Sequence, residues 1–167
     1  VKNIDIRNSY IDMLLDKFPK INKKVIVDCG NGTASVIVKD IYSKIFNNVS
    51  YINSISDGSF PIHNPDPNVS SNLKWLIDEV KLRDFDLGIA FDGDADRVGI
   101  VDNQGNIITT DYLVAIFSKD IIKNNDNKDI IIDIKCSKAV EHEIKKQGGI
   151  PVIVKNGSAY IETVCHD

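Results

Sequence analysis

The stretch LGIAFDGDADRVGIV, residues 87–101, decides how the chain folds. Two apolar runs, 87–91 and 98–101, flank three aspartates that alternate with Gly and Ala. Short apolar runs bounded by turn residues are typical of buried strands. The stretch therefore predicts two strands joined by an acidic loop.

The acidic loop carries a dense set of charges. Asp92, Asp94 and Asp96 repel one another unless a cation lies among them. Ligands that offer only oxygen suit a hard divalent ion, with Mg²⁺ first among them. Arg97 follows at once, and its guanidinium suits a phosphate. The loop therefore predicts a metal ion beside a phosphorylated ligand.

Two other interpretations of the loop are weaker. An EF-hand also begins with alternating acids, but it needs Gly at loop position 6 and Glu at position 12. Counted from Asp92, those positions hold Arg97 and Asn103, and the flanks read as strands. A solvated acidic hairpin turn is the structural alternative. Three alternating acids followed by Arg between apolar strands make it the less favoured one.

The motif D-G-D-A-D-R closely resembles the metal loop of the α-D-phosphohexomutases, the phosphomannomutase/phosphoglucomutase family. Other matching pieces occur in the family's order, over nearly the whole chain. They are VDCGNG at 27–32, DGSFP at 57–61, HNPDP at 63–67, DLGIAF at 86–91, DIKC at 133–136 and KNG at 155–157. The acidic loop and the F-P-x-H-x-P-D-P stretch are the specific pieces.

Segments with helical spacing alternate with apolar runs, which predicts a layered α/β fold with crossover connections. Helices are expected at 10–18, 33–46, 70–83, 110–123, 138–147 and 159–165, and strands at 24–27, 49–55, 86–91, 98–101, 107–109, 130–134 and 151–154. The resemblance implies a mixed sheet with flanking helices.

The resemblance also implies a domain arrangement. Residues 1–106 would be the second mutase domain with the metal loop, and residues 107–167 the first part of the third, sugar-binding domain. The second stretch would be a similar α/β unit. Both ends look cut, since family members are much longer chains of four domains.

The implied activity is that of a Mg²⁺-dependent phosphomannomutase/phosphoglucomutase, an isomerase that interconverts hexose 1-phosphate and hexose 6-phosphate through an enzyme phosphoserine. The family's catalytic loop reads S-H-N-P, but here Ile62 precedes His63, so this chain lacks the serine and alone is expected to be inactive. Two alternatives stay open: a fragment of a phosphoglucosamine mutase, and a catalytically inactive truncated metal-binding module.

The resemblance assigns roles to single residues. The three aspartates of the acidic loop would hold Mg²⁺, and Arg97 would contact the phosphate. Lys135 would reach the sugar and assist proton transfer, and Lys155 and Ser158 would help to bind substrate. Relatives commonly carry His where this chain has Ser158, and a hydroxyl can hydrogen-bond a sugar but cannot shuttle a proton near neutral pH.

Two further motifs are interpreted as structural. The turn Gly30-Asn31-Gly32 lies between a strand and a helix, where phosphates often bind, but it lacks the G-x-G-x-x-G spacing and the Walker lysine. The stretch His63-Asn64-Pro65 is interpreted as rigid turn geometry set by its prolines.

Bulk properties exclude several classes of protein. The net charge is -4 and basic residues form no stripe, which argues against a nucleic-acid surface. No apolar run approaches the roughly 20 residues that a membrane span needs. Three widely spaced cysteines fit neither a zinc site nor a disulfide framework, so we expect a cytoplasmic protein with free thiols. A hexose phosphate is the expected partner, and the sequence favours no oligomeric state.

Overall fold

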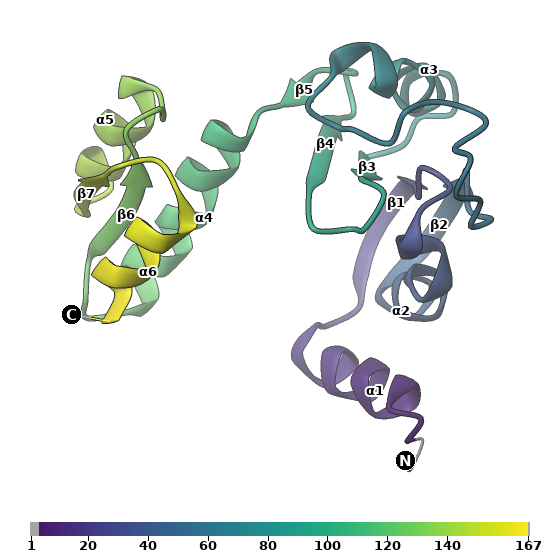
Figure 1. The fold of residues 1–167 in the computed structure, drawn as a ribbon, viewed down its shortest axis with the longest axis horizontal. Coiled ribbons are helices and arrows are strands. Elements are labelled where there is room, and N and C mark those ends of the chain that lie inside the picture. The colour runs from purple at the N-terminus through teal and green to yellow at the C-terminus, as the bar shows by residue number, and fades with distance from the viewer. Residues whose placement is uncertain (1–3, 167) are drawn as a thin grey trace. The chain divides into compact units, whose positions relative to one another are not determined.

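The computed structural model describes residues 4–166, and the chain divides into two compact units, residues 1–108 and 109–167 (Figure 1). Each unit has parallel strands connected through helices. The predicted α/β class, with a mixed sheet and flanking helices, is confirmed. The assignment of 1–106 and 107–167 to the second and third domains of a mutase stays a prediction.

The sheet of the first unit has the strand order β2-β1-β3-β4-β5. The strands are β1 (Ile21–Asp28), β2 (Phe46–Ile52), β3 (Leu87–Phe91), β4 (Val98–Asp102) and β5 (Ile107–Ile108). β1 pairs in parallel with both β2 and β3, whereas β4 is antiparallel to β3 and to β5. Because β1 and β3 are parallel neighbours, Asp28 and Phe91 end at the same edge of the sheet.

Helices cover the two faces of this sheet. They are the 3₁₀ helix η1 (Thr33–Val36), α2 (Val38–Ile45), the 3₁₀ helix η2 (Ser70–Leu73) and α3 (Lys74–Leu82), and α1 (Arg7–Lys17) packs against α2. Val25 and Val27 of β1 pack with Val38 of α2, whereas Ile26 packs with Leu76 of α3. Successive residues of a strand point to opposite faces, so a strand buried on both faces needs a layer of helix on each.

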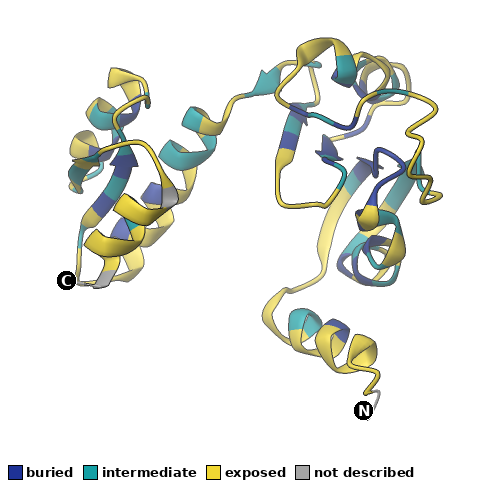
Figure 2. Ribbon diagram, in the orientation of Figure 1, coloured by how far each residue is buried: buried dark blue, intermediate teal, exposed yellow. Residues whose placement is uncertain are grey.

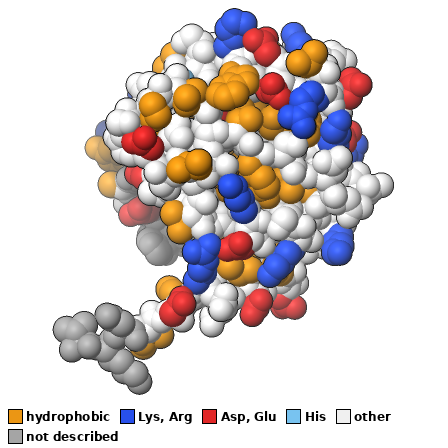
Figure 3. All heavy atoms as spheres, turned by 90° about the vertical axis from the view of Figure 1, so that its right-hand side faces the viewer, with side chains coloured by type: hydrophobic (Ala, Val, Ile, Leu, Met, Phe, Trp, Pro, Cys, Tyr) orange, Lys and Arg blue, Asp and Glu red, His pale blue; other side chains and the backbone are white. Residues whose placement is uncertain are grey.

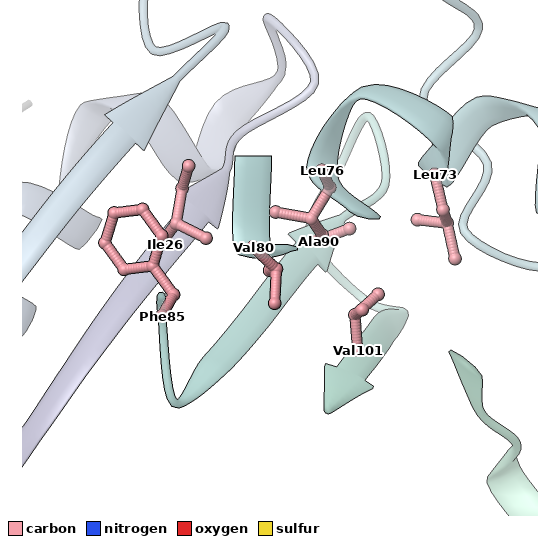
Figure 4. Packing of buried hydrophobic residues seen from close by; sticks show 7 residues of the cluster. All are labelled: Ile26, Leu73, Leu76, Val80, Phe85, Ala90 and Val101. Atoms are coloured by element: carbon pink, nitrogen blue, oxygen red, sulfur yellow. The ribbon is translucent and has the colours of Figure 1, made fainter. Parts of the chain in front are cut away.

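The core on the α3 side is shown in Figure 4, where the labelled side chains converge between α3 and the strands. Its members are Ile26, Leu73, Leu76, Val80, Phe85, Ala90 and Val101. β1 passes from exposed at its start to fully buried at its end (Figure 2). The glycine turn that follows β1 therefore begins at a fully buried strand end.

Two predicted helices are shorter than expected and begin as 3₁₀ turns. The helix expected over 33–46 divides into η1 and α2, because Ile37 has φ −131° and interrupts the α-helical backbone, and Phe46 already belongs to β2. The run of β-branched residues at this point disfavours a continuous α-helix. The helix expected over 70–83 likewise divides into η2 and α3.

The second unit contains a two-stranded parallel sheet. Its elements are α4 (Thr110–Asn124), β6 (Asp129–Asp133), α5 (Lys138–Lys146), β7 (Ile150–Val154) and α6 (Ser158–His166). Ile132 of β6, Val140 and Ile144 of α5, and Ile122 of α4 form its core. In the register of the two strands Asp133 lies opposite Val154, so the loops that follow them begin side by side.

Two surface properties bear on the classes excluded above. Along residues 4–166, no helix combines the length and the apolar character that crossing a membrane requires. On the face drawn in Figure 3, acidic and basic side chains are interspersed with one another. Such a mixed pattern differs from the basic stripe that a nucleic-acid backbone would need.

Candidate functional site

The acidic loop joins β3 to β4 at the edge where β1 also ends. Asp92 is fully buried, whereas Asp94 and Asp96 are exposed. One carboxylate oxygen from each of the three lies within 4.8 Å of the others. Ala95 makes the turn with φ +64° and donates its N–H to the carbonyl of Asp92 over 3.3 Å. The structure therefore brings the three predicted metal ligands together.

The chemistry of this cluster fits a hard divalent cation. All three donors are carboxylates, the ligands that Mg²⁺ and Ca²⁺ prefer. The pKa of Asp96 is raised, first by its hydrogen bond with Asp92 and then by repulsion from Asp94. Negative charge is thus concentrated to the point of self-repulsion, and a cation at this point would relieve it. Asp92, Asp94 and Asp96 are the residues that would hold a metal ion.

Arg97 is held in place by Asp92. Its Nε donates to Oδ2 of Asp92 over 2.8 Å, and its backbone N–H donates to Oδ1 over 3.1 Å. Burial raises the pKa of Asp92, but the hydrogen bonds and the charge of Arg97 outweigh it, and the pKa lies below its usual range. Each carboxylate oxygen has a second lone pair, so Asp92 keeps acceptor capacity for a metal.

A second carboxylate fixes the other side of the guanidinium. Nη1 of Arg97 donates to Oδ1 of Asp66 over 3.0 Å. Within residues 4–166, no group accepts a hydrogen bond from Nη2, and the Arg97 side chain is 50% exposed. Arg97 therefore presents one end of its fork to solvent while Asp66 and Asp92 hold the other groups.

Asp66 is a site residue that the sequence analysis missed. It lies in the F-P-x-H-x-P-D-P stretch, which was interpreted as rigid turn geometry. The turn is indeed tight, since the N–H of Asn68 donates to Asp66 Oδ1 over 3.0 Å. The only sequence signal was an acid in a proline-rich loop of the same chain, and 31 residues separate it from its arginine.

A buried aspartate at the end of β1 attaches the same proline-rich loop to the sheet. Asp28 Oδ1 accepts hydrogen bonds from the N–H of Gly30 and from Nδ2 of Asn53, both over 2.9 Å. Its Oδ2 lies 3.0 Å from Nε2 of His63. His63 is thus occupied by structural partners, in agreement with the interpretation of His63-Asn64-Pro65 as turn geometry.

The glycine turn packs directly against the acidic loop. The N–H of Thr33 donates to the carbonyl of Gly93 over 2.9 Å, and a Cβ on Gly32 would lie 2.6 Å from that oxygen. Gly30 has φ +55°, and a Cβ there would lie 2.7 Å from Cβ of Pro65. The turn between β1 and η1 is therefore used for close packing, which supports its structural interpretation.

The predicted substrate-binding residues of the second unit follow the ends of β6 and β7. Lys135 Nζ donates to Oδ1 of Asn156 over 3.0 Å. Lys155 Nζ lies 5.6 Å from the centre of the Tyr160 ring. Ser158 is the first residue of α6, but its side chain lies outside the described part of the structure. Asn156 was quoted in the sequence analysis only as part of a motif, and its bond to Lys135 was not foreseen.

The fold and this arrangement of residues match a known class of domain. A family model described as phosphoglucomutase/phosphomannomutase, alpha/beta/alpha domain II, matches residues 7–105. The chain belongs to this family.

Particular relatives extend the match beyond that domain. A phosphomannomutase/phosphoglucomutase of Pseudomonas aeruginosa is 42% identical over 163 residues, which are 97% of this chain and 35% of the relative. A phosphomannomutase of Methanocaldococcus jannaschii is 38% identical over 164 residues, 98% of this chain and 36% of the relative. The chain thus spans about a third of the length of these relatives.

A solved structure has a similar fold. A phosphoglucomutase/phosphomannomutase family protein from Burkholderia thailandensis superposes with a TM-score of 0.92 at 29% identity. The match covers 99% of this chain and 36% of that structure.

Proposed function

We propose that this chain is the central part of a Mg²⁺-dependent phosphomannomutase/phosphoglucomutase, which interconverts hexose 1-phosphate and hexose 6-phosphate. The phosphoserine of the reaction would come from a part of the enzyme outside these residues, so the isolated chain would not turn over substrate. The observation that carries the proposal is the cluster of three carboxylates with Arg97 beside it. The relatives' names, mannose and glucose mutases alike, support a hexose phosphate as substrate.

Asp92, Asp94 and Asp96 would hold the magnesium ion in this proposal. When bound, the ion supplies Lewis-acid withdrawal of charge from a phosphoryl group. Phosphoryl transfer depends on positioning and on electrostatic stabilisation, and the residues of the chain supply both. Arg97 would bind a phosphoryl oxygen with Nη2, the end of its guanidinium that the protein leaves open.

The second unit would contact the sugar. Lys135 carries an amino group two residues after the end of β6, at the edge where α/β folds bind ligands. In this proposal it binds a sugar hydroxyl and assists the loss of its proton. Lys155 and Ser158 are proposed as further contacts to substrate, from the loop and helix start that follow β7.

The experiment that tests the proposal compares Asp94→Asn with Asp126→Asn in the complete enzyme. Both residues are exposed, but Asp126 lies outside the cluster. We expect Asp94→Asn to lower turnover by about 100-fold or more, since it removes a ligand of the ion that stabilises the transferring charge. Asp126→Asn should leave turnover unchanged.

Binding of Mg²⁺ gives a second readout that is independent of activity. Calorimetric titration of the 167-residue chain should show weaker Mg²⁺ binding for Asp94→Asn than for Asp126→Asn. Equal turnover and equal Mg²⁺ binding in the two variants would refute the proposed metal site.

A further inference from the structure

A network of three side chains joins the loops that follow β6 and β7 in the second unit. Asp133 is the last residue of β6, Lys135 lies two residues beyond it, and Asn156 lies two residues beyond the end of β7. The parallel register of Asp133 with Val154 places the two loops side by side. Residues 21 positions apart in the chain can therefore bind one another.

Each polar group of the network has a defined partner. Asp133 Oδ1 accepts the N–H of Lys135 over 2.6 Å, and its Oδ2 accepts a hydrogen bond from Nδ2 of Asn156. Asn156 Oδ1 accepts from Nζ of Lys135 over 3.0 Å. The N–H of Lys135 and, next, the amide of Asn156 hold the pKa of Asp133 below its usual range, so the carboxylate stays charged.

The charges at its two ends fix the orientation of the amide. A carboxylate accepts hydrogen bonds and an ammonium group donates them, so the NH₂ end of Asn156 must face Asp133 and its oxygen must face Lys135. A flipped amide would place a donor against the ammonium and an acceptor against the carboxylate. Asp133 therefore fixes the orientation of the Asn156 amide, and the amide oxygen in turn fixes the position of the Lys135 ammonium group.

The backbone permits this reach, and the lysine keeps capacity for a ligand. Gly157 follows Asn156 with φ +127°, a conformation that favours glycine, so the chain turns sharply after the amide. An ammonium group has three donors, and one is given to Asn156, which leaves two for the oxygens of a ligand. Lys135 and Asn156 are both exposed, so a ligand can reach them.

We propose that Asn156 is a positioning residue, which acts through Lys135 by holding its ammonium group toward an oxygen of the hexose phosphate. This inference rests on the proposed function, in which Lys135 contacts the sugar. Asn156 itself need not touch the substrate. Its oxygen removes much of the freedom of a long, flexible side chain before substrate arrives, so less ordering of the lysine remains to be achieved in the transition state.

The first test measures the lysine directly. In protein labelled with ¹⁵N-lysine, NMR relaxation reports how ordered each ammonium group is. We expect the order parameter of Lys135 to fall in Asn156→Ala, because this change removes the oxygen that accepts the hydrogen bond of the ammonium group. Asn124→Ala, an exposed asparagine on α4, is the control and should leave Lys135 unchanged. An unchanged order parameter in Asn156→Ala would overturn the inference.

The second test measures turnover in the complete enzyme. We expect Asn156→Ala to lower kcat by about tenfold while KM changes by less than about twofold, the size of effect that residues orienting a functional group produce. Asp133→Asn combined with Asn156→Ala should cost no more than Asn156→Ala alone, because both act on the same lysine. Additive losses would overturn the relay from Asp133 through Asn156.

A third variant separates this inference from the function on which it rests. Lys135→Met should lower kcat by more than Asn156→Ala does. If Lys135→Met is severe but Asn156→Ala is harmless, the lysine acts as proposed and the positioning role of Asn156 is wrong. If Lys135→Met is itself harmless, the role of the lysine in the proposed function is wrong, and the positioning role falls with it.

Discussion

Asp92 belongs both to the core and to the acidic loop. It is buried directly after β3, yet its two oxygens hold Arg97 and lie beside the carboxylates of Asp94 and Asp96. A buried carboxylate is tolerated only when donors compensate for the loss of water, and Arg97 supplies two. The two neighbouring aspartates are exposed and make no such contribution to folding.

This contrast predicts different stability effects for two aspartates of one motif. Without divalent ions, we expect Asp92→Asn to lower the free energy of unfolding by about 2 kcal/mol, because an amide NH₂ would face the donors of Arg97. Asp94→Asn should leave stability unchanged or raise it, since it removes one of three mutually repelling charges. Urea titrations of both variants check this, and equal losses would contradict it.

At the scale of elements, two segments remote in sequence, the glycine turn and the proline-rich loop, meet around the acidic loop. The glycine turn after β1 contacts Gly93. In the proline-rich loop, the Phe60 ring lies 3.3 Å from the position that a Cβ on Gly93 would take, and Asp66 binds Arg97. The acidic loop is therefore shaped from outside as well as by its own turn. Contacts between backbone atoms leave no room for an added side-chain atom, because backbone atoms cannot rotate away as side chains do.

The glycine turn offers a sharp test of this packing. A methyl group on Gly32 would lie 2.6 Å from the carbonyl oxygen of Gly93, so Gly32→Ala must displace the acidic loop. We expect a loss of about 1 to 3 kcal/mol in the free energy of unfolding, together with weaker Mg²⁺ binding in calorimetry. Gly58→Ala is the matched control, since nothing lies within 4 Å of the added methyl group. Similar behaviour of the two variants would show that the contact is not needed.

The sequence predicted features that depend on residues close together in the chain, and it did not predict contacts between residues far apart in it. The strands around the acidic loop were predicted because each is a continuous apolar run, and the meeting of three carboxylates followed from their spacing. The bonds of Arg97 to Asp66 and of Lys135 to Asn156 join residues 31 and 21 positions apart. No local pattern specifies such a pair, because strand order decides which loops meet.

The interrupted helix at Ile37 was missed for a local reason. Apolar residues at helical spacing continue through this point, and such spacing fits a 3₁₀ turn followed by an α-helix as well as one longer helix. The roles of Asp92, Asp94, Asp96 and the three polar residues of the second unit in metal and substrate binding stay predictions.

At the scale of the whole molecule, the change from parallel to antiparallel pairing at β3 and β4 turns a strand end into a hairpin. The parallel half of the sheet brings the ends of β1 and β3 to one edge, and the hairpin then returns the chain to the core. The acidic loop can thus be short, because both of its ends are held by hydrogen-bonded strands. The sheet topology therefore determines where both ends of the acidic loop lie.

The buried core of the first unit also sets how the protein responds to alkali. Burial, first, and then repulsion from Asp28 raise the pKa of the Cys29 thiol to about 12, from an ordinary value of 9.0. Burial and nearby ionisable groups likewise raise the pKa of Tyr51 to about 12, from 10.0. In the folded protein both groups therefore stay neutral at a pH where the unfolded chain has already lost these protons.

The folded protein should therefore lose stability in alkali. Unfolding releases protons above pH 9, so the free energy of unfolding should fall as pH rises from about 9 toward 12, by at most about 1.4 kcal/mol per pH unit for each group. Urea titrations at intervals from pH 8 to 11 measure the slope. Cys29→Ala removes one group and should flatten it, whereas an unchanged slope in that variant would assign the effect to other residues.

The contact between Gly32 and Gly93 has a consequence for gene shuffling. Two homologous members of this family recombined anywhere between codons 33 and 92 would give a chimera whose turn comes from one parent and whose acidic loop comes from the other. If the parents differ in the backbone positions of the turn or of the acidic loop, the two segments would not fit against each other in the chimera. A crossover beyond codon 108 inherits turn and loop as one block, so this boundary is where libraries of chimeras should retain most of their folded members.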